Sequence, residues 1–261
     1  MPISVTHIDT ACMLLEIDGL RLLTDPVFDA PGKWYHHGFG AWSKKTGMPA
    51  LTVEQIGNID VLLLSHHQHK DNFDEAGRKV ADKIPMILST PAAQKAMPRI
   101  QGLAPWETIT VYTPNKNKLR ITAVPAQHHP SWMPSFLSGP VTGFIIECPE
   151  PELKCIYISG DTVFFRGMHV INHRFPKIDI AFFHVGSAQF RYLSGWGRFT
   201  MHSNDLLLAA QLFEPAQIIP IHQHGWSHFK ENKTIAQKVL QKYPEASERI
   251  LWLKSGIRVF L

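Results

Sequence analysis

The sequence predicts an α+β protein in which helices cover β-sheets. Many short apolar runs have the length of strands, whereas few segments show the apolar spacing of an amphipathic helix. The two kinds of segment alternate without the regular order of a doubly wound parallel sheet. With 44% hydrophobic and 18% charged residues, the 261-residue chain can bury a core and lacks the composition of a disordered protein. Since neither a linker nor an internal repeat interrupts the chain, we expect one domain over residues 1–261.

The first third of the chain contains four predicted strands and one helix. The strands SVTHI, CMLLEI and LRLLT come first, and Asp18-Gly19 before the third is a hairpin signal. Residues 26–50 combine Pro, Gly and five aromatic residues, a composition typical of a long surface loop. A buried strand over 60–65 ends in a histidine-rich loop, and a helix is expected over 72–84.

The rest of the chain is mostly strand-like. The predicted strands are MILS, TITVY, LRITAVPA, GFIIEC, KCIYIS, DIAFFHV, QIIPIH, RILWL and IRVFL. Helices are expected over 91–98, 203–213 and 231–242. The apolar runs are far shorter than the roughly 20 residues of a transmembrane helix, and the first ten residues lack a secretory signal. We therefore expect a cytoplasmic protein without a transmembrane segment.

Charge and cysteine content exclude some classes of protein. The 26 Lys and Arg residues against 22 Asp and Glu residues give a net charge of +4, but the basic residues are scattered, so no nucleic-acid partner is expected. An anionic or amphiphilic small molecule is a better candidate. The three cysteines lack metal-site spacing, and each is expected to be a small buried apolar residue: Cys12, Cys148 and Cys155.

Histidine is the unusual residue, with 15 in the chain. Four predicted strands end in residue types that bind metals, in the segments LLLSHHQHKDN (62–72), VPAQHH (124–129), YISGDT (157–162) and IPIHQH (219–224). The candidate ligands in these segments are His66 or His67, His69, Asp71, His128, Asp161 and His222. Nitrogen and oxygen ligands without thiolate suit Zn²⁺, with Mn²⁺ or Fe²⁺ as alternatives.

These segments, together with LLTDPVFD (22–29), resemble the motifs of the metallo-β-lactamase-fold hydrolases in the right order over nearly the whole chain. The branch that the sequence resembles includes ascorbate-6-phosphate lactonase and N-acylphosphatidylethanolamine phospholipase D. The resemblance implies a four-layer αββα sandwich with one or two metals at the edge of the sheets. It also assigns the ligands: His67, His69 and His128 for the first metal, Asp71 and His222 for the second, and Asp161 between them.

The sequence departs from the family pattern in the histidine loop. Asn72 stands where the family has a histidine, and a neutral amide is a poorer zinc ligand, so the second site is weakened. The loop also has three histidines in four residues. The HxHxD spacing favours His67, whereas the Ser-His pair that usually ends the strand favours His66.

Other residues near the motifs have structural alternatives. Asp71 could cap the helix that follows, and Asp161 could be a turn residue. Asp25 is expected to orient a ligating histidine, and His202 is either a catalytic residue near the substrate or a neighbour of a helix cap. His184, Trp226 and His228 are candidates for the pocket, whereas four histidines are expected in exposed loops: His36, His37, His169 and His173. A further set lines a pocket or forms a homo-oligomer interface: Trp132, Met133, Phe136, Phe190, Tyr192 and Trp196.

The function expected is metal-dependent hydrolysis of an ester, lactone or phosphodiester bond. A bound cation lowers the pKa of water from roughly 15.7 to about 7 and so supplies hydroxide at neutral pH. Asp71 would orient this nucleophile and carry a proton to the leaving group. The alternative from another class is a metal-binding scaffold or sensor without turnover. A nuclease would need a basic groove, which the linear charge pattern does not show.

Overall fold

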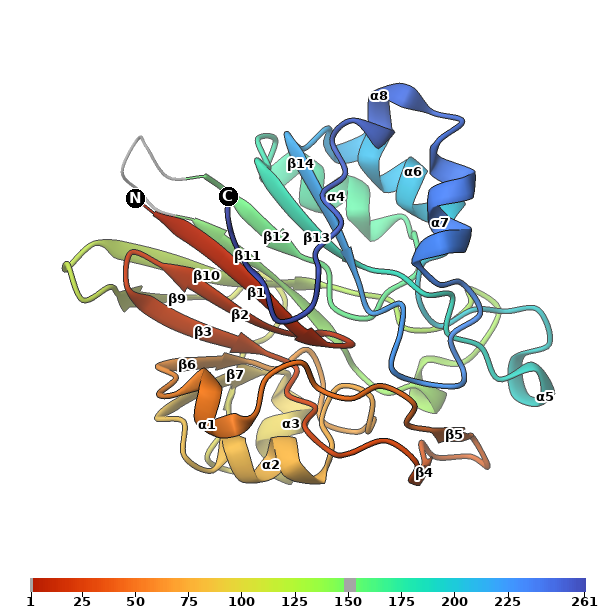
Figure 1. Ribbon diagram of the computed structural model, residues 1–261, viewed down its shortest axis with the longest axis horizontal. Helices are drawn as coiled ribbons and strands as arrows, with labels where there is room; N and C mark the ends of the chain where they lie inside the picture. Colours follow the sequence, from red (N-terminus) through yellow and green to blue (C-terminus); the bar gives the residue numbers. More distant parts are fainter. Residues whose placement is uncertain (1, 148–153) are drawn as a thin grey trace.

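The computed structural model describes residues 2–147 and 154–261, so Cys148 lies outside the described residues. Two large β-sheets pack face to face, and helices cover the outer face of each (Figure 1). Helices α1 to α3 lie against one sheet, and α4, α6 and α7 lie against the other (Figure 1). The expected αββα sandwich is confirmed.

The first sheet has seven strands in the order β15-β1-β2-β3-β6-β7-β8. Strands β1 to β3 form an antiparallel meander, and β3, β6, β7 and β8 run parallel to one another. The strands are β1 (Ile3–Asp9), β2 (Cys12–Ile17), β3 (Leu20–Thr24), β6 (Val61–Leu63), β7 (Met86–Ser89), β8 (Gln101–Gly102) and β15 (Arg258–Phe260). The helices on its outer face are α1 (Val53–Ile56), α2 (Glu75–Ala81) and α3 (Pro91–Ala96).

The second sheet has six strands in the order β14-β13-β12-β11-β10-β9. Strands β9 to β12 are antiparallel, and β12 to β14 are parallel. They are β9 (Thr108–Tyr112), β10 (Lys118–Pro125), β11 (Thr142–Glu147), β12 (Ile156–Ile158), β13 (Ile180–His184) and β14 (Gln217–Ile221). The helices on this side of the molecule are α4 (Gly167–Arg174), α6 (Ser203–Phe213), α7 (Lys233–Leu240) and α8 (Pro244–Ser247).

The central strands are apolar on both faces because each sheet is buried on both sides. In β2, Met13 and Leu15 pack into the cluster between the sheets, whereas Cys12 and Leu14 pack towards α2 and α3. Tyr157 of β12 likewise packs under the helices of the other side. This two-sided burial explains why the strands appear in the sequence as continuous apolar runs.

One predicted strand, RILWL over 249–253, is wrong. Ile250 forms only an isolated parallel bridge to Ile218 of β14, with Leu251 N–H donating to the carbonyl of Ile218 at 2.8 Å. The next donor along β14 would be residue 220, which is a proline without an N–H. The parallel ladder therefore stops after one residue.

The loop over 26–50 and the helix after the histidine loop also differ from expectation. The loop contains a small antiparallel hairpin of β4 (Trp34–His36) and β5 (Trp42–Lys44). Helix α2 begins at Glu75 rather than at 72, because Asp74 caps it by accepting a hydrogen bond from Gly77 N–H at 2.7 Å. Two short helical segments were not expected near the site, η1 (Ser135–Leu137) and α5 (Arg191–Ser194).

Within the described residues, the structure has no helix that is both long and apolar enough to cross a bilayer. The helices that cover the sheets are short, and α6, at 11 residues, is far below the roughly 20 that a transmembrane helix needs.

Candidate metal centre

Histidine and aspartate side chains from four strand ends meet at one edge of the two sheets. His66 follows β6, His128 follows β10, Asp161 follows β12 and His222 follows β14. Two groups form: His66, His69 and His128, and Asp71, Asp161 and His222. Within each group, the candidate ligand atoms all lie within 4.8 Å of one another.

The first group consists of three buried imidazoles. Nδ1 of His69 lies 3.0 Å from Nε2 of His66 and 3.1 Å from Nε2 of His128. Nδ1 of His128 donates to the carbonyl of Phe199 at 2.8 Å, which leaves Nε2 with a free lone pair. Burial lowers the pKa of His66 to about 3 and also lowers the pKa of His69 and His128. These imidazoles are therefore neutral at neutral pH, the form that binds a metal.

The second group places two carboxylates beside His222. Nε2 of His222 lies 3.4 Å from Oδ1 of Asp161 and 3.6 Å from Oδ2 of Asp71. Nδ1 of His184 donates to Oδ1 of Asp161 at 2.9 Å. Oδ2 of Asp161 lies 3.9 Å from Nε2 of His128, so this carboxylate lies between the two groups.

Charge within the second group shifts all three pKa values. Burial alone would raise the pKa of Asp71, but His222 and His228 outweigh it and hold that pKa well below its usual range. The pKa of Asp161 is likewise lowered, since His222 and His184 outweigh burial. Burial would lower the pKa of His222, yet Asp161 and Asp71 raise it to about 9. Without a cation, His222 thus carries the positive charge that the carboxylates require.

The donor atoms of the second group fit a divalent cation. Oδ1 of Asp71, Oδ2 of Asp161 and Nε2 of His222 are buried and find no hydrogen-bond partner among the described residues. Buried polar atoms are normally paired, so unpaired atoms that face one another indicate a missing partner. Imidazole nitrogen and carboxylate oxygen are ligands for Zn²⁺, Mn²⁺ and Fe²⁺.

The backbone positions the candidate ligands at sharp turns. His222 has a left-handed φ of 61°, which is uncommon for a residue other than glycine, and its N–H donates to Thr10 at 2.9 Å. Asp25 also has a positive φ, 33°, directly after β3. Its Oδ1 accepts from Ser65 N–H at 2.8 Å and from Ser65 Oγ at 2.9 Å. Ser65 Oγ in turn lies 2.9 Å from Nδ1 of His66, so Asp25 contacts that candidate ligand through Ser65.

The structure distinguishes between the two histidines that the sequence left open. His66 belongs to the first group, whereas His67, which the HxHxD spacing favoured, lies outside both groups. The backbone carbonyl of His67 accepts a hydrogen bond from Arg78 Nη2 at 2.7 Å. The loop is one residue longer than the HxHxD spacing assumes, so His66 and His69 face the same point.

Asn72 and His202 occupy different surroundings. Asn72 is fully buried, with Nδ2 lying 3.4 Å from Ser65 Oγ and Oδ1 without a hydrogen-bond partner among the described residues. His202 is the N-cap residue of α6, and its Nδ1 lies 2.7 Å from Oδ2 of Asp205. His202 is in neither group of candidate ligands.

Two further histidines contact Asp71. Nε2 of His228 lies 3.0 Å from Oδ2 of Asp71, and Nδ1 of His37 lies 3.5 Å from Oδ1. The expectation that His37 is an exposed loop residue was wrong, because it is 9% exposed and Nε2 lies 2.7 Å from Ser43 Oγ. Its position in an aromatic-rich loop was the signal that could have identified it.

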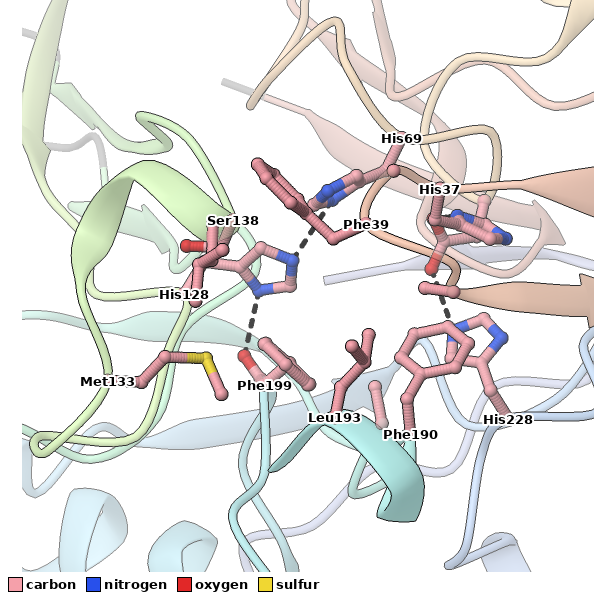
Figure 2. A pocket seen from close by; sticks show the side chains of 15 residues that line it. His37, Phe39, His69, His128, Met133, Ser138, Phe190, Leu193, Phe199 and His228 are labelled. Carbon is pink, nitrogen blue, oxygen red and sulfur yellow. Dashed lines mark hydrogen bonds and ion pairs between the residues drawn. The ribbon is translucent and has the colours of Figure 1, made fainter. Parts of the chain in front are cut away.

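A cavity opens beside the two groups and is lined by His69, Asp71 and His128 as well as by His37 and His228. Figure 2 shows apolar side chains along one side of this cavity: Met133, Phe190, Leu193 and Phe199. Met133 and Phe190 were among the expected pocket residues. The other members of that set are exposed rather than lining this cavity: Trp132, Phe136, Tyr192 and Trp196.

Comparisons with known proteins agree with this fold and site. A β-lactamase superfamily domain matches residues 20–223. A UPF0173 metal-dependent hydrolase of Pyrobaculum aerophilum is 26% identical over 227 residues, which cover 85% of this chain and 84% of that protein. A UPF0173 metal-dependent hydrolase of Pyrococcus abyssi is 27% identical over 187 residues, which cover 69% of this chain and 75% of that protein.

Solved structures share the fold at low sequence identity. An isothiocyanate hydrolase from Delia radicum gut bacteria has a TM-score of 0.80 at 21% identity, covering 98% of both chains. A metallo hydrolase of Ignicoccus hospitalis has a TM-score of 0.70 at 19% identity, covering 100% of this chain and 99% of the other. The chain belongs to the β-lactamase superfamily. The relatives from Pyrobaculum aerophilum and Pyrococcus abyssi are named metal-dependent hydrolases, in agreement with the function expected from the sequence.

Proposed function

We propose that the protein hydrolyses an ester, lactone or phosphodiester bond with one or two cations, most favourably Zn²⁺, held by the two groups of ligands. His66, His69 and His128 would hold one cation. Asp71 and His222 would hold the second, with Asp161 between them. The convergence of unpaired buried donor atoms beside a cavity carries this proposal.

Different residues of the chain have different roles in the proposed hydrolysis. A bound cation would lower the pKa of water to about 7 and polarise the bond under attack. Asp71 Oδ1 orients the attacking water, and the carboxylate then carries a proton to the leaving group. His228 holds the other oxygen of Asp71 at 3.0 Å, which fixes the direction of the carboxylate. His202, expected as a second catalytic residue, would contact only a substrate that extends towards α6.

Asn72 bears on the number of cations. An amide oxygen in place of an imidazole leaves the second group with fewer strong ligands. We therefore expect the purified protein to hold nearer one cation than two per chain.

Three further expectations from the sequence remain predictions. They are the branch resembling ascorbate-6-phosphate lactonase and N-acylphosphatidylethanolamine phospholipase D, the cytoplasmic location and a homo-oligomer.

Metal content and turnover of matched histidine variants test the proposal. We expect His69→Ala to lose both the bound cation and turnover, because it removes the imidazole that lies between the other two. His67→Ala is the control, and it should keep both, since His67 is outside the groups of ligands. Circular dichroism checks that each variant is folded.

The substrate panel should contain esters, lactones and phosphodiesters, and also an aryl isothiocyanate, because one structural neighbour is an isothiocyanate hydrolase. Turnover that survives in folded His69→Ala would refute the proposal. A full complement of metal without turnover on any substrate would favour the non-catalytic scaffold or sensor. Two tightly bound ions per chain would contradict the effect assigned to Asn72.

A further inference from the structure

Away from the candidate metal centre, the walls of the cavity are mostly apolar. Phe39, Met133, Phe190, Leu193 and Phe199 line it together with smaller apolar residues. Apart from the imidazoles and Asp71, Ser138 supplies the polar side chain of the lining. Among the described residues that line the cavity, none is Lys or Arg.

The apolar walls touch the residues of the centre directly. The ring of Phe190 stacks on the imidazole of His228, with centroids 5.0 Å apart and an interplanar angle of 12°. The ring of Phe199 lies 5.9 Å from that of His128, whose Nδ1 donates to the Phe199 carbonyl. A substrate whose reacting bond reaches the centre must therefore place the adjoining group against these aromatic and aliphatic side chains (Figure 2).

A charged group in that place would be left without a partner. Phosphate and carboxylate groups are usually bound by Arg, Lys or clustered N–H donors. Arg191, which follows Phe190 in the chain, lies over the ring of Trp196 at 4.3 Å, and buried Lys45 is paired with Asp9. Burying an unpaired charge costs far more than burying an apolar group. The Lys and Arg residues that give the chain its net charge of +4 thus lie outside the lining of the cavity.

We infer that the substrate carries an uncharged aryl or medium alkyl group next to the bond that is broken, so that a charged group at this position is excluded. The inference rests on the proposed function and is worked out here for the carboxylic esters and lactones among the proposed substrates. Water adds across the acyl–oxygen bond: its oxygen joins the acyl carbon, and one of its protons passes to the leaving oxygen. The products are a carboxylic acid and an alcohol.

A matched pair of substrates tests this selectivity in the metal-loaded protein. The acyl groups of p-nitrophenyl hexanoate and mono-p-nitrophenyl adipate have the same number of carbon atoms, but adipate ends in a carboxylate. We expect kcat/KM to be at least about tenfold higher for hexanoate, which corresponds to about 1.4 kcal/mol. Leu193→Lys places an ammonium on the cavity wall and should reduce this ratio at least about fivefold. Leu208→Lys, at an exposed position of α6, is the control and should leave the ratio unchanged.

A binding measurement makes the test independent of turnover. Hexanohydroxamate and the monohydroxamate of adipic acid both bind metals through the same group, and calorimetry gives their Kd values for the metal-loaded protein. We expect the uncharged tail to bind about tenfold more tightly. Equal or tighter binding of the carboxylate in the metal-loaded protein would overturn the inference and leave the proposed function intact. A protein that binds no cation would refute the proposed function and this inference with it.

Discussion

At the scale of single residues, Ser65 determines how His66 presents its ring. The Ser65 hydroxyl donates to Oδ1 of Asp25, which also accepts from the Ser65 N–H. Having one proton to give, the hydroxyl must accept from Nδ1 of His66. The Nε2 lone pair of His66 is then directed towards His69. Ser65 and Asp25 thereby select the tautomer that binds a cation.

We therefore predict that Ser65→Ala weakens cation binding about 10–100-fold, the usual effect of removing a partner of a metal ligand. Competition with a chromophoric chelator measures the affinity. Ser89→Ala is the matched control: Ser89 is fully buried, and its hydroxyl has no hydrogen-bond partner among the described residues. An unchanged Kd in Ser65→Ala would show that the Asp25–Ser65 contact does not orient His66.

At the scale of elements, helix α2 approaches the turn after β3 more closely than a side chain would allow. A Cβ on Gly77 would lie 1.8 Å from the carbonyl oxygen of Pro26 and 2.7 Å from its carbonyl carbon. This contact brings the helix after the histidine loop against the turn that contains Asp25. The glycine is thus required for packing, although glycine disfavours a helix.

Gly77→Ala should accordingly destabilise the protein, in contrast to the gain of about 1 kcal/mol that alanine gives in an exposed helix. Overpacking of this kind costs roughly 1–3 kcal/mol of the free energy of unfolding. Urea denaturation of the metal-depleted protein measures the change. Lys79→Ala, on an exposed position of the same helix, should stay within about 0.5 kcal/mol. A stabilised Gly77→Ala would show that α2 does not pack against Pro26 in this way.

At the scale of the whole molecule, buried histidines set the dependence of stability on pH. Burial lowers the pKa of His7 and of His37 to about 4, and that of His66 to about 3. The unfolded chain binds these protons near pH 6.5, whereas the folded protein does not until pH falls further. Stability is thus lost as pH falls from about 6.5 towards 4. His222, with a pKa raised to about 9, stabilises the metal-free fold below pH 6.5 and loses this effect as pH rises towards 9.

We predict that the metal-free protein is most stable near pH 6.5. The free energy of unfolding should fall more steeply towards acid pH, because several buried histidines contribute there, whereas His222 alone among them contributes on the alkaline side. Two carboxyl groups oppose the acid loss: burial raises the pKa of Asp74 to about 6 and holds the pKa of Asp25 well above its usual range, but the buried histidines outnumber them. Chemical denaturation across pH 4–9 measures the curve. His7→Gln should flatten the acid side, whereas exposed His173→Gln should not. Stability that rises steadily from pH 6.5 to pH 4 would contradict this account.

Much of the fold could be predicted because local patterns agree with the final environment. The strands CMLLEI, LRLLT and TITVY have the predicted ends, since apolar runs bounded by turn residues define them locally. The expected strand over 249–253 failed because strand pairing depends on the donors of the neighbour, here Pro220. Helix α4 was missed because it buries only Met168 and Ile171 and so shows little apolar periodicity.

The sequence by itself determined the class of the protein and the kinds of ligand, because the order and spacing of the histidine and aspartate motifs do not depend on how the loops turn. Only the tertiary structure decided which side chains meet. It placed His66 rather than His67 in the first group, and it brought His37 and His228 to Asp71. Contacts such as His228 with Asp71 join residues 157 positions apart, and such distances are set by the packing of two sheets and their loops rather than by any local pattern.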